Sequence, residues 1–232
     1  MKPWAKIASL FVLLLAAIAG RAGEVLDRIV VVVNDEVILQ SDVDVEVRYE
    51  ALLSDKPLER VTAADRHDAL DRLVDQTLIL QQMRQAEIPP LPPEELVAEV
   101  QKIRQQLVVG ASDQSWAAAL ERYGLTADEF AYRAGIQYQI TRFLDLRFRP
   151  MVRVDRASIE EYYRDKFLPQ WRQKNAQPAP PLREVESMIE SVLVEQEIDQ
   201  LLVAWLATLR NQGDIRLHPA LNQPSQQGGV KP

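Results

Sequence analysis

The sequence contains no cysteine, two histidines and eight glycines among its 232 residues. The absence of cysteine excludes thiol catalysis, disulfide bonds and cysteine metal sites. His67 and His218 lie far apart in the chain, without the spacing of a metal motif, so each is interpreted as an ordinary side chain. The glycines form no phosphate-binding loop, which argues against the use of ATP. We therefore predict no catalytic residue, no metal and no cofactor.

Positive charge is also scarce. The formal net charge is −7, and the N-terminal residues 1–23 contribute three positive charges to it and no acid, which leaves −10 for residues 24–232. Nucleic-acid binding needs clustered positive charge, and docking on anionic lipid needs it too. The acidic main part of the chain therefore argues against both partners.

Long apolar runs are lacking as well. The longest, 7–19, has thirteen residues, whereas a helix needs about 20 to cross a bilayer. The run follows Lys2 and Lys6 and ends in the small residues Ala17 to Ala19, which is the layout of a secretory signal peptide. We predict that residues 1–23 are a cleaved signal and that the exported mature chain is not inserted in a membrane; an uncleaved anchor is the alternative.

The clearest local signal is RIVVVVNDEVILQSDVD at residues 28–44. A valine-rich run favours a strand, Asn34-Asp35 suits a tight hairpin turn, and a second apolar run follows. Ser41 with Asp44 resembles a helix N-capping box. A two-stranded hairpin is not stable alone. The only evident third strand is 214–218, so we expect the C-terminal helix and strand to fold back onto the N-terminal part.

Between these ends the pattern predicts helices, which gives a mainly α fold with a small β-hairpin completed by a C-terminal strand. The expected helices cover about 41–53, 62–87, 93–107, 112–124, 126–148, 155–167 and 182–210. Residues 168–181 contain four prolines and no periodicity, so we predict a linker or exposed loop there. The polar residues 219–232 are predicted to be a disordered tail.

The apolar residues of the expected helix 126–148 spread over an arc of about 200°, at about 100° per residue. A one-sided helix needs an apolar face only somewhat wider than about 100°. The helix is therefore either covered on two sides, which we favour, or leaves part of its apolar surface in a groove. Gly135 within it indicates a close approach by a neighbouring element.

The stretch IVVVVNDEVILQSDVD, followed by LDRLVDQTLILQQMRQAEIP, resembles the opening of the SurA and parvulin-type periplasmic foldase family. Residues 73–81 match the helix motif of that family, and Trp205 to Ile215 resembles its closing helix and strand. The resemblance implies a helical SurA N-terminal or trigger-factor-like chaperone domain over 24–167, to which 182–218 returns. The parvulin isomerase domain that normally lies between these parts is replaced here by 168–181.

The resemblance implies an ATP-independent periplasmic chaperone that binds unfolded exported polypeptides, such as outer-membrane β-barrel proteins, through an apolar groove. Two alternatives remain open: an accessory protein that docks one folded partner, and a residual peptidyl-prolyl isomerase. The candidate peptide-binding residues come from the helix 126–148, from the end of 155–167 and from the segment that follows it, with core packing as the alternative for each aromatic: Tyr132, Ile136, Ile140, Phe143, Phe167 and Trp171.

Overall fold

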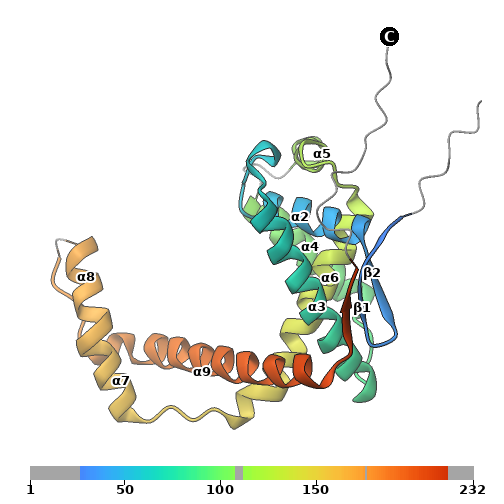
Figure 1. The fold of residues 1–232 in the computed structure, drawn as a ribbon. Coiled ribbons are helices and arrows are strands. Elements are labelled where there is room, and N and C mark those ends of the chain that lie inside the picture. The colour runs from blue at the N-terminus through green and yellow to red at the C-terminus, as the bar shows by residue number, and fades with distance from the viewer. Residues whose placement is uncertain (1–26, 108–111, 176, 219–232) are drawn as a thin grey trace, which may run out of the picture.

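The computed structural model describes residues 27–107, 112–175 and 177–218, so the predicted signal peptide and tail lie outside the described residues. The fold is mainly α with one small three-stranded antiparallel sheet, as the sequence predicts (Figure 1). Figure 1 shows two regions, which we call the body (27–148 and 201–218) and the arm (149–200). One long helix, α9 (Leu182–Gln212), runs through both.

The sheet has the strand order β2-β1-β3. Strands β1 (Ile29–Val33) and β2 (Glu36–Leu39) form the predicted hairpin, and β3 (Ile215–Leu217) pairs with β1 from the other end of the chain. At the turn, Asn34 has φ 56°, a conformation that asparagine tolerates. Its backbone N–H donates to the carbonyl of Asp214 at 2.8 Å, and its side-chain oxygen accepts from Asp214 N–H at 2.9 Å. The predicted return of the C-terminus is thus confirmed.

Helix α2 (Gln40–Leu53) begins earlier than the predicted Ser41–Asp44 cap, which is wrong. The N-cap position is Leu39, whose N–H donates to the Asp42 carboxylate at 2.9 Å. The Ser41 hydroxyl instead donates to the Asp27 carboxylate, outside the helix. An acid at the third helical position can satisfy the N-cap amide from any residue type at the cap, since that bond needs only the backbone.

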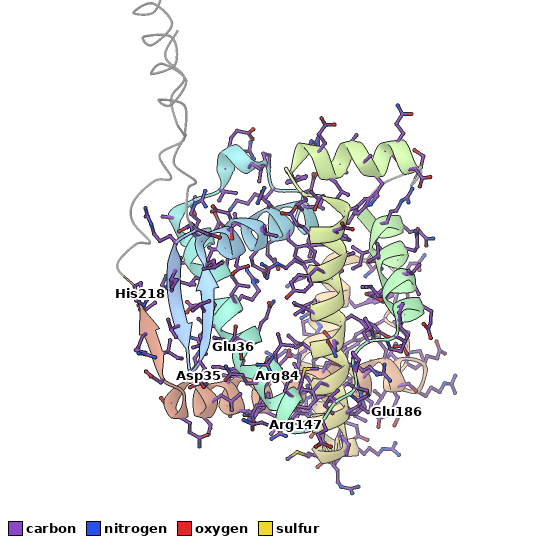
Figure 2. All side chains as sticks on the ribbon, turned by 90° about the vertical axis from the view of Figure 1, so that its right-hand side faces the viewer. Asp35, Glu36, Arg84, Arg147, Glu186 and His218 are labelled. Atoms are coloured by element: carbon purple, nitrogen blue, oxygen red, sulfur yellow. The ribbon has the colours of Figure 1, made fainter. Side chains whose placement is uncertain are left out.

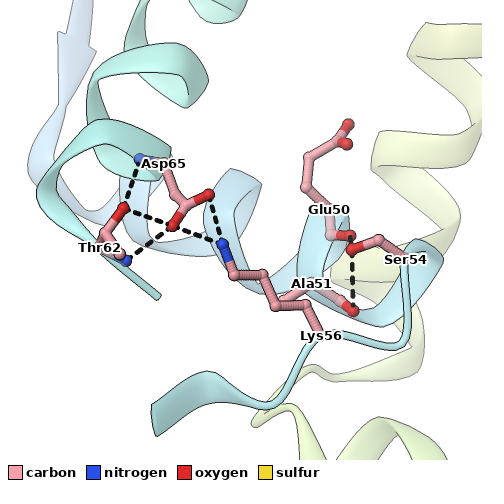
Figure 3. Close-up of polar contacts among 6 residues, drawn as sticks. All are labelled: Glu50, Ala51, Ser54, Lys56, Thr62 and Asp65. Carbon is pink, nitrogen blue, oxygen red and sulfur yellow. Dashed lines mark hydrogen bonds and ion pairs between the residues drawn. The ribbon is translucent and has the colours of Figure 1, made fainter. Parts of the chain in front are cut away.

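The other helices of the body begin where the capping residues predict. Thr62 caps α3 (Ala63–Gln85), Pro93 is the first residue of α4 (Pro93–Leu107), Ser112 caps α5 (Asp113–Arg122) and Thr126 caps α6 (Ala127–Phe148). Figure 3 shows the first of these boxes, where the Asp65 carboxylate accepts from Thr62 N–H and from Lys56 Nζ, both at 2.7 Å. Lys56 lies in the connection between α2 and the short helix η1 (Leu58–Arg60). The box therefore also fixes the path of that connection.

Three apolar clusters fill the body. The first lies between the sheet, α2, α3 and the end of α9, the second between α2, α5 and α6, and the third between α3, α6 and α9. A buried ion pair joins α2 to α6: Arg133 Nη1 lies 3.4 Å from Glu46 Oε2, with the two side chains 7% and 2% exposed. Leu96 of α4 lies 3.0 Å from the position that a Cβ on Gly135 would take, which explains the glycine.

Surface ion pairs fasten the ends of the elements. Figure 2 shows Glu36 of the hairpin beside Arg84 at the end of α3, and these side chains form an ion pair. Arg210 of α9 forms ion pairs with two residues of α3: its Nε lies 2.6 Å from Asp75 Oδ1, and its Nη1 lies 3.2 Å from Asp71 Oδ1. The last turns of α9 are thereby fixed to the body.

The arm leaves the end of α6 through η2 (Arg149–Met151) and an extended connector, 152–155, to α7 (Arg156–Tyr162). Arg149, at the start of this connection, forms an ion pair with Glu195 of α9, with Nη2 and Oε1 2.6 Å apart. A π-helical turn, η3 (Tyr163–Phe167), then leads directly into α8 (Leu168–Lys174). The predicted loop 168–181 is therefore wrong for 168–174. Pro169 follows the π-helical turn directly, where the regular i→i−4 hydrogen bonding of an α-helix is already interrupted.

Candidate peptide-binding surfaces

The structure separates the candidate residues of α6. Tyr132 is 65% exposed on the body, with the Arg133 guanidinium 6.0 Å from its ring centre. Ile140 and Phe143 are buried, 4% and 6% exposed, in the cluster that α3 and α9 cover. Ile136 is half-buried at the edge of the same cluster. The broad apolar face of α6 is thus covered on two sides, and Ile140 and Phe143 are core residues rather than the lining of an open groove.

The C-terminal end of α6 is closed by aromatic packing on α9. The centres of the Phe148 and Trp205 rings lie 5.6 Å apart in an edge-to-face arrangement, and the Arg147 guanidinium lies 4.6 Å from the centre of the Trp205 ring. Figure 2 shows Arg147 beside α9 at this end of the helix. These contacts fix the direction in which α9 leaves the body.

The two candidate residues of the arm belong to a stack of three aromatic rings, which we call the aromatic ladder: Tyr163, Phe167 and Trp171. The first two rings stack with centres 5.6 Å apart and planes 17° apart, and the next pair lies at 5.7 Å and 32°. All three side chains are half-buried. The arm thus carries aromatic surface that no cluster of the body covers.

The π turn explains the alignment of the ladder. In an α-helix, residues eight apart are rotated by about 80° around the axis, at about 100° per residue. The π turn closes hydrogen bonds one residue later than an α turn and so rotates less per residue. The turn over Tyr163–Phe167 therefore brings Tyr163 back toward the line of Trp171. The three rings are spaced four residues apart, and the sequence analysis missed the stack because it predicted a loop over 168–181.

The segment 177–181, QPAPP, runs back along α8 (Figure 1). Trp171 Nε1 donates to the carbonyl of Gln177 at 3.1 Å, and the Tyr163 hydroxyl donates to the carbonyl of Pro180 at 2.8 Å. The segment therefore contacts both ends of the stack through its backbone. It runs antiparallel to the helix that carries the rings.

A second surface of the arm lies between the connector and α9. Met151, Val152 and Val154 form one wall of this hollow, Leu193 and Glu197 form the other, and Ser158 closes its end. Met151 is 65% exposed and Met188, also on α9, is 48% exposed. The sequence analysis missed this hollow because its walls lie about forty residues apart in the chain.

The start of α7, beside the hollow, is capped by Asp155. The Asp155 carboxylate accepts from Ser158 N–H at 2.8 Å, and this bond keeps the pKa of Asp155 below its ordinary value. The carboxylate thus stays ionised at neutral pH and caps the helix. Among the residues that the structure describes, no group of acidic or histidine side chains could hold a metal ion.

The comparisons with known proteins concern the body. A model of the SurA-like N-terminal domain family matches residues 3–142. The chain belongs to this family. Its members are chaperone-like and periplasmic. A search of the curated proteins gives no match.

The SurA-like match ends within α6, so the arm lies outside it. In the described part of the chain, α8 passes to α9 through 175–181 with no isomerase domain between them. None of the helices in the described ranges has the length and apolar character to span a membrane.

Proposed function

We propose that the protein is an ATP-independent periplasmic chaperone that binds unfolded exported polypeptides on the apolar surface of its arm. The observation that carries the proposal is the aromatic ladder on a helical arm that projects from the SurA-like body. The family supports the chaperone class, and the ladder and the connector hollow supply the apolar surface.

The chemistry of the arm suits transient binding. Half-buried aromatic rings offer large apolar area with few rotatable bonds, and methionines adapt to ligands of different shape. Met151 places such an adaptable side chain in the wall of the connector hollow. A holdase that uses no ATP must release its clients by simple dissociation, and such partial, shallow contacts favour fast dissociation.

Outer-membrane β-barrel proteins fit this surface as clients. Their strands alternate apolar and polar residues and carry aromatic girdles. In the unfolded chain these residues are exposed, and the ladder and the hollow offer two separate apolar contacts for them. Two linked contacts raise the overall affinity without making either one strong.

Fluorescence anisotropy tests the proposal. Labelled segments of outer-membrane proteins, diluted from urea, are titrated with protein purified from cells that express the full chain, beside a labelled folded protein. We expect saturable, micromolar binding of several unrelated segments and none of the folded protein. Phe167→Ala should weaken binding several-fold, whereas Tyr132→Ser, a change of an exposed aromatic on the body, should not.

Two results would contradict the proposal. Absence of binding to every unfolded segment would exclude a general holdase. Tight binding of one folded envelope protein, with none of the unfolded segments, would establish the accessory protein instead.

A further inference from the structure

The aromatic ladder has a more specific feature than apolar area, which is the way the chain itself covers it. We propose that the ladder is a binding site for proline-rich polypeptide segments in the polyproline II conformation, and that 177–181 occupies it in cis. The inference rests on the proposed function, since it names a ligand class for one of the two surfaces of the arm.

The first argument is the conformation of the covering segment. Three of its five residues are prolines, which fix φ near −65°. Pro181, its last residue, has φ −64° and ψ 152°, values of the polyproline II helix. Such a segment has no internal hydrogen bonds, so its carbonyls are free to accept from a partner.

The second argument is the pattern of hydrogen bonds. A polyproline II helix repeats every three residues, so carbonyls three apart point to the same side. The accepting carbonyls are those of Gln177 and Pro180, three residues apart. The donors are an indole N–H and a phenol hydroxyl at the two ends of the aromatic stack. The ladder therefore binds the repeat of the backbone and not one particular side chain.

The third argument is distance. Three residues of polyproline II rise by about 9 Å, and the eight residues between the donors rise by about 12 Å along an α-helix. Side chains as long as tyrosine and tryptophan can converge over this small difference. Aromatic-lined grooves with indole and hydroxyl donors are a general means of recognising proline-rich segments, because the ligand loses little conformational entropy on binding.

The fourth argument concerns exchange. Within the covering segment, Gln177 and Pro178 are exposed, and Ala179 and Pro180 are only half-buried. The segment is bound to the ladder by two hydrogen bonds from neutral side-chain donors, and such bonds contribute little net stability in water. A segment held so weakly can be displaced by an external proline-rich chain. While the segment is bound, the three rings remain only half-buried.

The test uses a fluorescent peptide with two copies of the segment, QPAPPQPAPP, and the same peptide with every proline replaced by alanine as its control. Both are titrated with the full chain and with a variant whose residues 177–181 are replaced by Gly-Ser-Gly-Ser-Gly. A tethered competitor acts at an effective concentration in the millimolar range, so its removal should tighten proline-peptide binding by on the order of tenfold. Adding Trp171→Ala should abolish this gain, and Tyr163→Phe, which keeps the ring and removes the hydroxyl donor, should reduce it.

A measurement on the unaltered chain guards against misfolding of the variant. The indole N–H resonance of Trp171, identified by its loss in Trp171→Phe, should move saturably with excess proline peptide and not with the alanine peptide. Equal affinity of both chains for the proline peptide, or an indole resonance that does not move, would overturn the proposal. A concentration-dependent dimer that excludes the peptide would also overturn it, because a second copy of the chain would then be the occupant.

The same chains, titrated with proline-free unfolded segments, separate this inference from the proposed function. Retained binding of those segments without any proline-peptide binding would refute the polyproline site alone. Loss of both would refute the chaperone proposal as well.

Discussion

The body and the arm use aromatic residues in opposite ways. In the body, Phe130 is 1% exposed and packs against Tyr49 at 5.4 Å and Trp116 at 4.8 Å. In the arm, the rings of the ladder stack mainly on one another and stay half-buried. The same side-chain type thus stabilises one region and remains available for contact in the other.

The two regions also differ in how their helices are held. The body has three apolar clusters, reciprocal capping boxes and a buried ion pair. The arm has a much smaller buried interface, in which Ile159 of α7 and Ile189 of α9 are 5% and 0% exposed. We therefore expect the buried contacts of the body to determine the free energy of unfolding. Substitutions on the surface of the arm, which lies outside the SurA-like match, should change that free energy little.

The largest expected effect separates the two kinds of aromatic residue. Phe130→Ala should lower the free energy of unfolding by about 4 kcal/mol, because it leaves a cavity among buried rings. The matched change Phe167→Ala on the arm should lower it by about 1 kcal/mol, since its ring keeps part of its solvent contact in the native state. Urea unfolding followed by circular dichroism measures both, and equal losses would contradict the distinction between body and arm.

The buried ion pair should give the next largest effect. Arg133→Met should lower the free energy of unfolding by about 3 kcal/mol at neutral pH, because it leaves the Glu46 carboxylate buried without its main partner. The double variant with Glu46→Gln should recover part of that loss. If the single and double variants were equally unstable, the pair would not be what joins α2 to α6.

Glu46 also predicts a pH dependence for the single variant. Burial already raises the pKa of Glu46 above its ordinary value, even with Arg133 present. A carboxyl group with a raised folded-state pKa costs stability while it is ionised, and this cost is relieved as the pH falls through the raised pKa. The deficit of Arg133→Met should therefore shrink as the pH falls from neutral toward 4.5, the ordinary pKa of a glutamate side chain. A deficit that stays constant over this range would contradict the assignment to a buried charge.

A smaller effect is expected at the capping box of α3. Thr62→Ala should lower the free energy of unfolding by about 1 kcal/mol, because α3 borders two of the body's clusters. Urea unfolding measures this loss.

The neighbouring Asp65 predicts a pH dependence. Its pKa is held far below the ordinary value, chiefly by the hydrogen bond from Lys56. Its stabilising contribution is present above the ordinary aspartate pKa and is lost as the pH falls below about 4. Thermal unfolding of Asp65→Asn against the unaltered protein, at neutral pH and at about pH 3, should show a difference that narrows in acid.

The corresponding change in the arm, Asp155→Ala, removes the cap of α7. It should loosen the start of α7 locally and leave the midpoint of global unfolding unchanged, as amide hydrogen exchange and thermal unfolding together would show. A cooperative loss of the whole fold would mean that arm and body form one unit of stability.

The sequence predicts the body well because its signals are local. Valine-rich strands around Asn34 and capping residues such as Thr62 and Thr126 act within a few residues, and the structure places the hairpin and both helices there. The third strand follows from the need of the hairpin for a partner. The start of α2 is the exception, because Asp42 caps it through a backbone amide that no side-chain pattern marks.

The arm is predicted poorly because its order depends on non-local or irregular geometry. The prolines give 168–181 the composition of a loop, yet the helix continues through the π turn into 168–174. The same limit applies in the body at α6. Ile140 and Phe143 are buried by α9, which lies some sixty residues later in the chain. Which apolar residues of a broad helical face remain exposed is decided by such returning elements.

The central claim is that the arm binds and the body supports. Hydrogen–deuterium exchange of the full chain, with and without a saturating unfolded outer-membrane segment, tests it most directly. The account predicts new protection in fragments that cover 151–158 and 163–181, and little change in fragments of α2, α3 and the sheet. Protection confined to the body, with unchanged exchange in the arm, would contradict the claim.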